Sequence, residues 1–276
     1  MCCCLTIAGS DSGGNAGVQA DLRAFHAYGL HGCTVFAALT AQNPFGVSAI
    51  HPVPADFVAA QLDAVLGVYD VRALKTGMLA DPAAIGVVAD RLAFHPEIAK
   101  VIDPVMVATS GARLVSEAAL EAIVTRLLPL ATLITPNLPE AEALCGNAVA
   151  PNAHRSSDAA HAADLARQIA AKYGCAVLVK GGHGAGSSAV DVLAASSDAP
   201  VREFSLPWVA DPVSTHGTGC TLAAALAAEL ALGADVEAAV AGAKRHVHQA
   251  IATSYLVGKG CGVLGFPGFS AARELI

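Results

Sequence analysis

Short apolar segments alternate with longer alanine-rich segments along most of the chain, and this alternation restricts the possible folds more than any other feature. The apolar segments have the length of buried strands and cover residues 2–8, 33–39, 73–78, 100–102, 132–135 and 176–180. The alanine-rich segments have the length and composition of helices and cover residues 16–28, 55–66, 82–94, 116–128 and 157–173. Residues 189–208 are typical of a β-hairpin. We therefore predict an α/β fold with a mostly parallel sheet between two helical layers (α/β/α), in a single domain over residues 1–276.

The composition favours a large core and argues against several classes of function. Hydrophobic residues make up 54% and charged residues 14%, and the net charge of −7 comes without a cluster of Lys and Arg. A nucleic-acid groove needs such a cluster. No apolar run has the length of a membrane span, and no leader pattern precedes the first strand. The eight cysteines form no CxxC pair, so neither a disulfide framework nor a zinc site is indicated, and we expect a reduced, cytoplasmic protein.

The strongest chemical signal lies in the loop that runs from Ser214 to Thr221, directly before a helical Ala/Leu run. The first N–H groups of a helix lack partners and carry partial positive charge, so anions bind there. Gly217 and Gly219 let the backbone approach an anion closely. Cys220 falls in the first turn, where we expect a lowered thiol pKa. We interpret this stretch as an anion hole for a transferring phosphoryl group; the alternative is an ordinary helix start with a buried cysteine.

Polar residues follow the predicted strands, where ligands bind in open α/β sheets. A glycine-rich turn after the first strand carries Asp11, and Asp21 follows it; both offer acceptors to a substrate, while Asp11 is alternatively a helix cap. The glycine spacing is not that of a dinucleotide-binding turn. Gln42 has a carboxamide that suits a ring nitrogen beside an amino group, or alternatively bonds the backbone. Met78 ends the third strand and either packs on a flat ring or belongs to the core.

Two acidic residues and one lysine follow the later strands. Asp103 ends a buried strand, and a buried carboxylate is costly unless it is paired or bound to a metal. Asn137 and Glu140 have the spacing of a capping box, or alternatively Glu140 helps to hold Mg²⁺ while Asn137 faces phosphate. Lys180 closes the sixth strand and offers a cation to nucleotide phosphates. The scattered histidines give no metal site.

Seven motifs in this order resemble the ribokinase-like superfamily, and within it the hydroxymethylpyrimidine/phosphomethylpyrimidine kinases of thiamine biosynthesis. The motifs are AGSDSGGNAGVQADL (8–22), TAQN (40–43), KTGML (75–79), IDPVM (102–106), TPNLPEAEAL (135–144), KGGH (180–183) and HGTGCT (216–221). The resemblance runs from about residue 5 to about residue 256, which is nearly the whole chain.

The resemblance implies ATP- and Mg²⁺-dependent phosphorylation of 4-amino-5-hydroxymethyl-2-methylpyrimidine, and then of its monophosphate to the diphosphate. It implies a cytoplasmic homodimer with small-molecule substrates and neither nucleic-acid nor membrane partners. Its motifs assign pyrimidine binding to Asp21, Gln42, Met78 and Val105. They assign the metal to Asp103 and Glu140, the ATP phosphates to Lys180, Thr218 and Asn137, and catalysis in the anion hole to Gly217, Thr218, Gly219 and Cys220.

The chain departs from related patterns at two positions. Sugar kinases of the superfamily usually carry Asp, the general base, where this chain has Cys220, as the pyrimidine and pyridoxal kinases do. Asn15 stands where many relatives have Gly. One alternative is a pyridoxal kinase, although Gln42 beside Met78 favours the aminopyrimidine. Another is a non-catalytic regulator that binds nucleotide or pyrimidine, which has no need of the phosphoryl-transfer groups.

Overall fold

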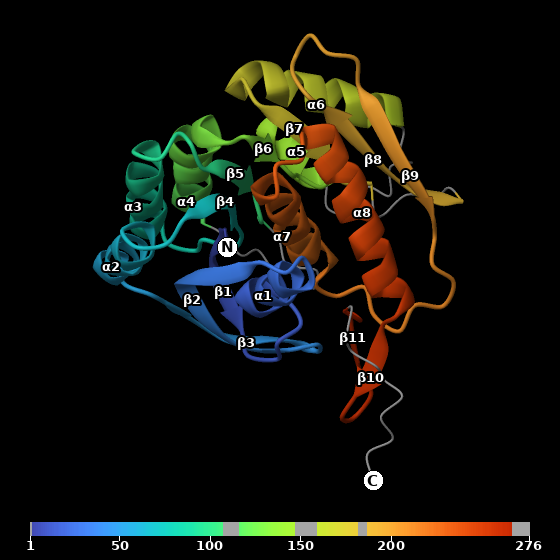
Figure 1. The fold of residues 1–276 in the computed structure, drawn as a ribbon, viewed down its shortest axis with the longest axis horizontal. Helices are drawn as coiled ribbons and strands as arrows, with labels where there is room; N and C mark the ends of the chain where they lie inside the picture. Colours follow the sequence, from blue (N-terminus) through green and yellow to red (C-terminus); the bar gives the residue numbers. More distant parts are fainter. Residues whose placement is uncertain (1, 107–115, 147–158, 182–186, 267–276) are drawn as a thin grey trace.

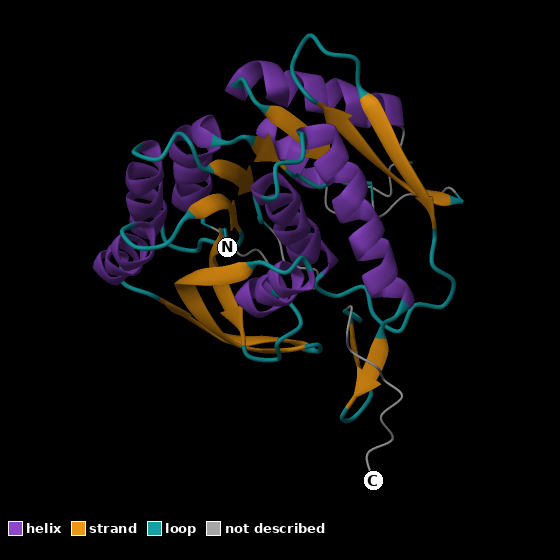
Figure 2. Cartoon of the chain, viewed as in Figure 1, coloured by secondary structure: helices purple, strands orange, loops and turns teal. Residues whose placement is uncertain are grey.

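The computed structural model describes residues 2–106, 116–146, 159–181 and 187–266, which form a nine-stranded sheet between two layers of helices (Figures 1 and 2). The strand order is β3-β2-β1-β4-β5-β6-β7-β8-β9. The strands from β2 to β7 in this order are parallel, while β3, β8 and β9 run antiparallel to their neighbours. The predicted α/β/α architecture with a mostly parallel sheet is therefore confirmed.

Each of the predicted strands is present. The strands are β1 Cys3–Asp11, β2 His31–Asn43, β3 Gly46–Pro52, β4 Val71–Thr76, β5 Ala99–Ile102, β6 Leu133–Ile134, β7 Ala176–Val179, β8 Ser188–Ala194 and β9 Arg202–Pro207. The predicted hairpin is the β8–β9 pair. Strand β2 continues four residues past its predicted end and turns back into β3, which the prediction lacks. Because β3 is an edge strand exposed along most of its length, it has no apolar run to mark it.

The helices cover both faces of the sheet. They are α1 Gly17–Ala27, α2 Ala55–Leu66, α3 Pro82–Ala93, α4 Glu117–Ala122, α5 Leu138–Leu144, α6 Ala159–Tyr173, α7 Thr218–Ala231 and α8 Val236–Ala252. The helix predicted over residues 116–128 is divided, since α4 gives way to a π-turn over Ile123–Leu127 and a 3₁₀ turn over Leu128–Leu130. Pro129 lies in that last turn, where it has no N–H to continue an α-helix. The prediction also lacks α8.

Two apolar clusters, one on each face of the sheet, form the core. In β1 the side chains of Cys3, Leu5 and Ile7 belong to the first cluster with α2 to α6, and Cys4 belongs to the second with α1, α7 and α8. This alternation is the two-residue period of a strand that is buried on both faces. Helix α7 packs against β1, β4 and β5, with residues 221–228 buried. The central position of α7 fixes where its N-terminal turn meets the ends of the strands.

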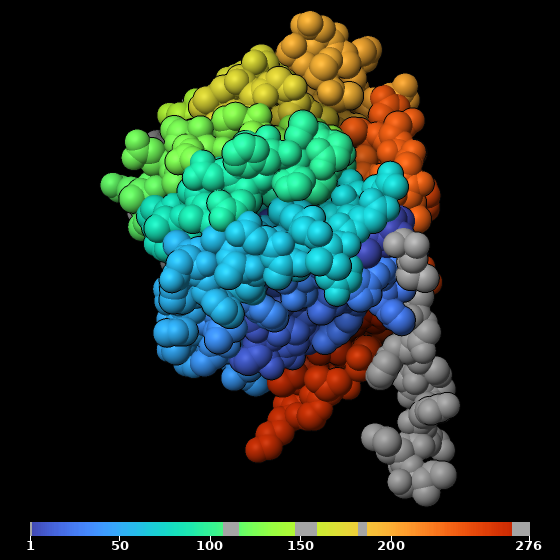
Figure 3. All heavy atoms as spheres, turned by 60° about the vertical axis from the view of Figure 1, so that its left-hand side comes forward, coloured from blue at the N-terminus to red at the C-terminus, as the bar shows by residue number. Residues whose placement is uncertain are grey.

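The C-terminal part of the described chain forms a separate antiparallel pair, β10 Tyr255–Val257 with β11 Cys261–Val263. This hairpin projects from the rest of the molecule in Figure 1 and is the red tip at the bottom of Figure 3. None of the helices in the described ranges has the length and apolar character needed to cross a membrane.

Candidate active site

A cavity of about 460 Å³ lies at the carboxyl ends of the parallel strands and reaches the first turn of α7. The residues around it come from loops that are far apart in the sequence, because parallel strands end at one edge of the sheet. All of the sequence-predicted site residues except Asp21 line this cavity, namely Gln42, Met78, Asp103, Val105, Asn137, Glu140, Lys180, Gly217, Thr218, Gly219 and Cys220. The folding of the chain thus gathers the predicted groups in one place.

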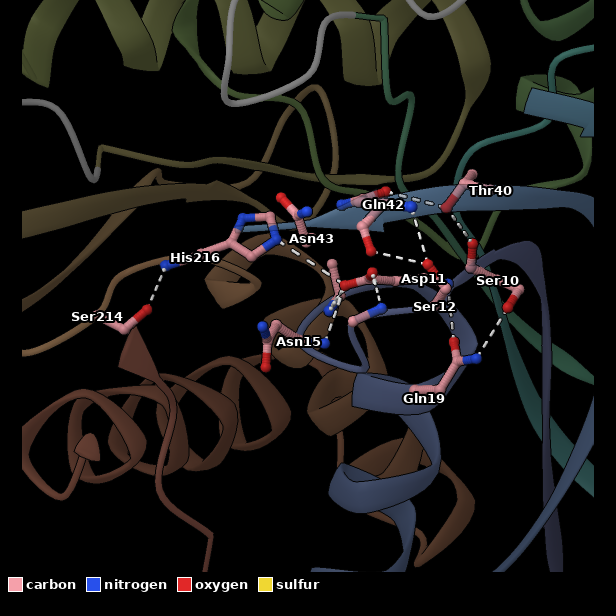
Figure 4. Close-up of polar contacts among 12 residues, drawn as sticks. Ser10, Asp11, Ser12, Asn15, Gln19, Thr40, Gln42, Asn43, Ser214 and His216 are labelled. Carbon is pink, nitrogen blue, oxygen red and sulfur yellow. Dashed lines mark hydrogen bonds and ion pairs between the residues drawn. The ribbon is translucent and has the colours of Figure 1, made fainter. Parts of the chain in front are cut away.

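The loop after β1 is organised by Asp11, whose carboxylate points inward (Figure 4). One of its oxygens accepts a hydrogen bond from the Gly13 N–H at 2.8 Å, and the other accepts from the N–H groups of Asn15 and Ala16. The His216 ring, which the sequence prediction did not single out, lies with Nε2 at 4.0 Å from the same carboxylate. Asp11 is therefore a loop-building residue, as its alternative capping role implied, rather than a free acceptor.

The glycine loop before α7 fits closely against this first loop. Gly217 has φ 87°, a left-handed conformation that glycine adopts without strain. A Cβ at Gly217 would stand only 2.0 Å from the Asn15 carbonyl oxygen, so a larger residue has no room. No side chain caps the N-terminus of α7, and the Thr218 hydroxyl donates to the Thr215 carbonyl instead. The helix N-terminus therefore faces the cavity without a protein anion on it, as an anion hole requires.

The opposite wall carries Gln42 and Met78. The backbone of Gln42 is fixed by two hydrogen bonds with the Ser12 hydroxyl, and its carboxamide oxygen accepts from Thr40 Oγ1 at 3.2 Å. Met78 extends across Gly9, where a Cβ would stand 2.6 Å from the methionine methyl group. Gly9 thus makes the space that lets Met78 reach the cavity. The cavity is thus lined by both a carboxamide and an apolar thioether, two groups that suit a planar heterocycle.

A lysine and two carboxylates occupy the cavity wall between β5, β6 and β7. Lys180 Nζ donates to Asp103 Oδ1 at 2.8 Å. Glu140 and Asn137 form the capping box of α5, so this alternative is correct, and Glu140 also accepts from the Met106 N–H. Burial, with a smaller contribution from the Asp103 carboxylate, raises the pKa of Glu140 to about 7, although Lys180 and these backbone N–H groups oppose the shift. Glu140 therefore both holds the helix and faces the cavity.

These carboxylates fit a magnesium ion that binds mainly through water and phosphate. Asp103 Oδ2 lies 3.9 Å from where a Cβ on Gly219 would stand, so this carboxylate faces the anion hole. Within the described ranges, no cluster of three or more His, Cys, Asp or Glu side chains could hold a metal. Magnesium commonly keeps several waters and binds one or two carboxylates together with substrate phosphates. The donor set therefore matches that mode of binding.

Cys220 lines the cavity from the first turn of α7, but the expected lowering of its thiol pKa is wrong. Burial raises the pKa of Cys220 above its ordinary value, and the carboxylates of Asp21 and Asp103 add to the increase. Lys75 and the Gly17 N–H act in the opposite direction without overcoming it. The effect of removing the sulfur from water is thus larger than the effect of the helix terminus.

Asp21, which was predicted to bind the pyrimidine, lies behind the cavity wall rather than on it. It sits on the sheet-facing side of α1, and its side chain is completely buried. Its carboxylate accepts from Lys75 Nζ at 2.9 and 3.1 Å and from the Thr6 hydroxyl at 2.6 Å. Both of its oxygens therefore serve this buried ion pair.

Most of the chain, including the residues around the cavity, matches a known protein family. Residues 11–265 match the family described as phosphomethylpyrimidine kinase. The chain belongs to the phosphomethylpyrimidine kinase family. A hydroxymethylpyrimidine/phosphomethylpyrimidine kinase of Rhizobium meliloti is 47% identical over 253 residues, which are 91% of this chain and 90% of that protein.

Solved structures of related kinases have the same fold. A phosphomethylpyrimidine kinase of Clostridium difficile matches with a TM-score of 0.77 at 35% identity, over 91% of this chain and 100% of that one. An ADP complex of Bacillus subtilis pyridoxal kinase matches with a TM-score of 0.83 at 33% identity, over 96% and 97% of the two chains. The predicted ribokinase-like fold is confirmed by these likenesses.

A further ion pair at the cavity was missed by the sequence prediction. Lys244 on α8 donates to Asp191 on β8 at 2.7 Å, and the other Asp191 oxygen accepts from the Gly181 N–H at 2.9 Å. The pair thus fixes the Gly181 backbone directly after Lys180. Gly182 and His183 of the same motif lie outside the described residues. In the sequence, Asp191 stands out as a charged residue within the apolar run of β8, which indicates a buried charge. Nothing in the sequence identifies Lys244 as its partner.

Proposed function

We propose that this chain phosphorylates 4-amino-5-hydroxymethyl-2-methylpyrimidine with ATP and Mg²⁺, and then phosphorylates the monophosphate to the diphosphate. The match of residues 11–265 with the phosphomethylpyrimidine kinase family carries this proposal. The cavity supports it, because a carboxamide, a helix N-terminus and a thiol line the same space at Gln42, Gly217 and Cys220.

The pyrimidine binds between Gln42 and Met78 in this proposal. The carboxamide of Gln42 has one donor and one acceptor side, which matches a ring nitrogen beside an amino group. Met78 and Val105 flank the ring, and both side chains line the cavity. This arrangement directs the hydroxymethyl group towards the first turn of α7.

The γ-phosphoryl group of ATP is transferred at the anion hole that residues 217–220 form. The hydroxymethyl oxygen bonds to the γ-phosphorus, its proton passes to the Cys220 sulfur when that sulfur is in its thiolate form, and the bond to the bridging oxygen breaks as ADP leaves. Lys180, Thr218 and Asn137 bind the nucleotide phosphates, and Asp103 with Glu140 would hold Mg²⁺, which would supply positive charge to the transferring group. Because burial raises the pKa of Cys220, the thiolate is a minor form at neutral pH, and positioning and charge stabilisation carry most of the catalysis.

Phosphorylation of pyridoxal is the second candidate. The structural likeness to the Bacillus subtilis pyridoxal kinase favours it. Gln42 argues against it, because pyridoxal offers a phenolic oxygen in place of the amino group. A non-catalytic regulator is less consistent with a cavity that keeps Cys220, Glu140 and Lys180 together.

We also infer that the chain works in the cytoplasm, as a homodimer of single-domain subunits. All eight cysteines are free, which supports a reducing compartment. The homodimer rests on the family resemblance.

A coupled ADP-release assay with ATP and Mg²⁺ tests the proposed activity. The aminopyrimidine alcohol, its monophosphate and pyridoxal are compared as acceptors in parallel. We expect both pyrimidines to be turned over with higher kcat/KM than pyridoxal. A preference for pyridoxal would replace the pyrimidine assignment, and the absence of acceptor-dependent ADP release would leave only a binding role.

The role of Cys220 is tested by Cys220→Ala. We expect a sharp fall in kcat with pyrimidine affinity nearly unchanged, because the sulfur faces the reacting oxygen rather than the ring. Calorimetry gives the affinity, and the ADP-release assay gives kcat. Unchanged turnover would mean that Cys220 only packs.

A further inference from the structure

The ion pair between Lys75 on β4 and Asp21 on α1 is the most deeply buried pair of charges in the described part of the chain. Both side chains are 0% exposed. Asp21 accepts from Lys75 Nζ with both oxygens, and the Thr6 hydroxyl supports it at 2.6 Å. The three groups come from α1, β1 and β4, so the fold itself determines their geometry.

Stability alone does not account for this pair. Removing two charges from water costs several kcal/mol per ion, roughly, and an apolar pair of similar volume is often as stable or more stable. The adjacent cluster on this face is apolar and contains Ala24, Phe25 and Ala73. An uncharged pair would therefore suit the packing, and the retained charges call for another role.

The Lys75 ammonium lies next to the proposed phosphoryl-transfer site. Lys75 and Cys220 line the same cavity. A Cβ at Gly77 would stand 2.9 Å from Lys75 Nζ, so glycine at this position leaves room for the ammonium. An ammonium has three N–H donors, and among the described residues Asp21 is the one side chain that accepts from it. A positive charge is thus fixed beneath the first turn of α7.

Several charged groups act on the Cys220 sulfur from the elements packed around it. Burial raises the pKa of the thiol most strongly, and Lys75 is the largest opposing influence. Asp21 and Asp103 raise the pKa, and the Gly17 N–H lowers it. Lys180, the other cation near the sulfur, is committed to Asp103 at 2.8 Å. Lys75 is therefore the cation best placed to support negative charge on the sulfur.

We propose that Lys75, held in place by Asp21 and Thr6, is a positioning residue that stabilises the Cys220 thiolate and the anion beside it during phosphoryl transfer. Asp21 fixes the ammonium and limits its field, so the two members of the pair act on Cys220 in opposite directions. This inference rests on the proposed role of Cys220 as the group beside the reacting oxygen.

The rate at which iodoacetamide alkylates Cys220 tests the proposal, because the thiolate is the reacting form. The Cys220 peptide is followed by mass spectrometry from pH 7 to pH 11, because the thiol pKa already lies above its ordinary value. Lys75→Met is expected to raise the midpoint of this profile by about one pH unit or more, which slows alkylation about tenfold below the midpoint. Asp21→Asn is expected to lower the midpoint, because the ammonium then acts without its counterion. Unchanged midpoints, or shifts in the same direction, would overturn the proposal.

Circular dichroism confirms that each variant is folded, and Arg91→Met, which breaks an exposed ion pair with Asp63, serves as the matched control. Where a single variant does not fold, the double variant Lys75→Met/Asp21→Asn replaces it, since it buries no charge. Its midpoint should lie above that of the unchanged protein, and an equal midpoint would overturn the proposal. If Cys220→Ala retains full turnover while the opposite shifts are found, the proposed role of Cys220 fails but the effect of Lys75 on its ionisation stands.

Discussion

Two lysine–aspartate ion pairs near the cavity differ in whether their charged groups can also interact with a ligand. The Lys75–Asp21 pair is closed, because both side chains are fully buried and both carboxylate oxygens are taken by Lys75 and Thr6. The Lys180–Asp103 pair is open, because the Lys180 side chain is 16% exposed and a single contact at 2.8 Å joins it to one Asp103 oxygen. Charges in the closed pair act only at a distance, whereas those in the open pair can be shared with a ligand.

This difference shows why burial and charge alone do not identify a binding residue. Both aspartates are buried, and both were predicted to bind ligands. The useful distinction is whether an oxygen remains uncommitted and faces the cavity, as Asp103 Oδ2 does near Gly219. A carboxylate whose oxygens are all used supports the structure or the electrostatics of the site, and substitutions should separate the two kinds.

The largest expected effect is on the stability of the closed pair. Asp21→Asn should lower the free energy of unfolding by about 3–5 kcal/mol, because it leaves the Lys75 charge buried without a partner. Urea denaturation measures the change. The double variant Lys75→Met/Asp21→Asn should recover most of the loss, since it removes both charges. A loss in the double variant as large as in the single one would mean that the charges themselves are not the cause.

Glu140, beside the open pair, should make stability depend on pH. Its pKa is raised from 4.5 to about 7, so the folded state holds this proton more tightly than the unfolded state. The resulting stabilisation is complete below pH 4.5 and disappears as the pH rises through 7. In EDTA, the unfolding free energy of the unchanged protein relative to Glu140→Gln should therefore fall by up to about 3 kcal/mol between pH 5 and pH 8. Parallel curves for the two proteins would contradict this.

The fold and the location of the site were predictable because both follow from periodic patterns. Apolar runs marked the buried strands, and the polar residues that end them meet at one edge of a parallel sheet. The exposed strand β3 was not predictable in this way, since an edge strand without an apolar run resembles a loop. Gln42 and Asp103 line the cavity as expected, because their position depends on the ends of strands and not on the rotation of a helix.

The buried position of Asp21 was not predicted, because a motif does not say which way a helical residue points. Its spacing did hold that information: Asp21 lies three residues after Val18 and four before Phe25, and both of these are buried. This places it on the apolar, sheet-facing side of α1. Lys75 was similarly marked as a charge within the apolar run of β4. The raised pKa of Cys220 had no such signal, because it depends on how deeply the finished fold buries the sulfur.

The open pair should affect turnover more than folding. Asp103→Asn is expected to reduce kcat about 100-fold, close to the loss found when one charge-stabilising group is removed from an active site. The melting temperature should change little, because Lys180 still reaches solvent and lies near Glu140. ADP release and thermal unfolding are measured on the same sample. A large loss of stability with normal kcat would place Asp103 with the closed pair and remove the distinction.

Gln42 belongs to neither ion pair. Its substitution therefore tests how much an uncharged side chain of the cavity contributes to pyrimidine binding. Gln42→Leu leaves the polar atoms of a bound pyrimidine ring unpaired, which costs about 1–2 kcal/mol and weakens binding about tenfold. Calorimetric titration with the aminopyrimidine alcohol gives the dissociation constant, and pyridoxal serves as a comparison ligand that should be affected less. Folding should not change, since the backbone of Gln42, and not its side chain, is fixed by Ser12. An unchanged dissociation constant would mean that another group reads the ring, and the selectivity of the cavity would then have to come from its charged wall.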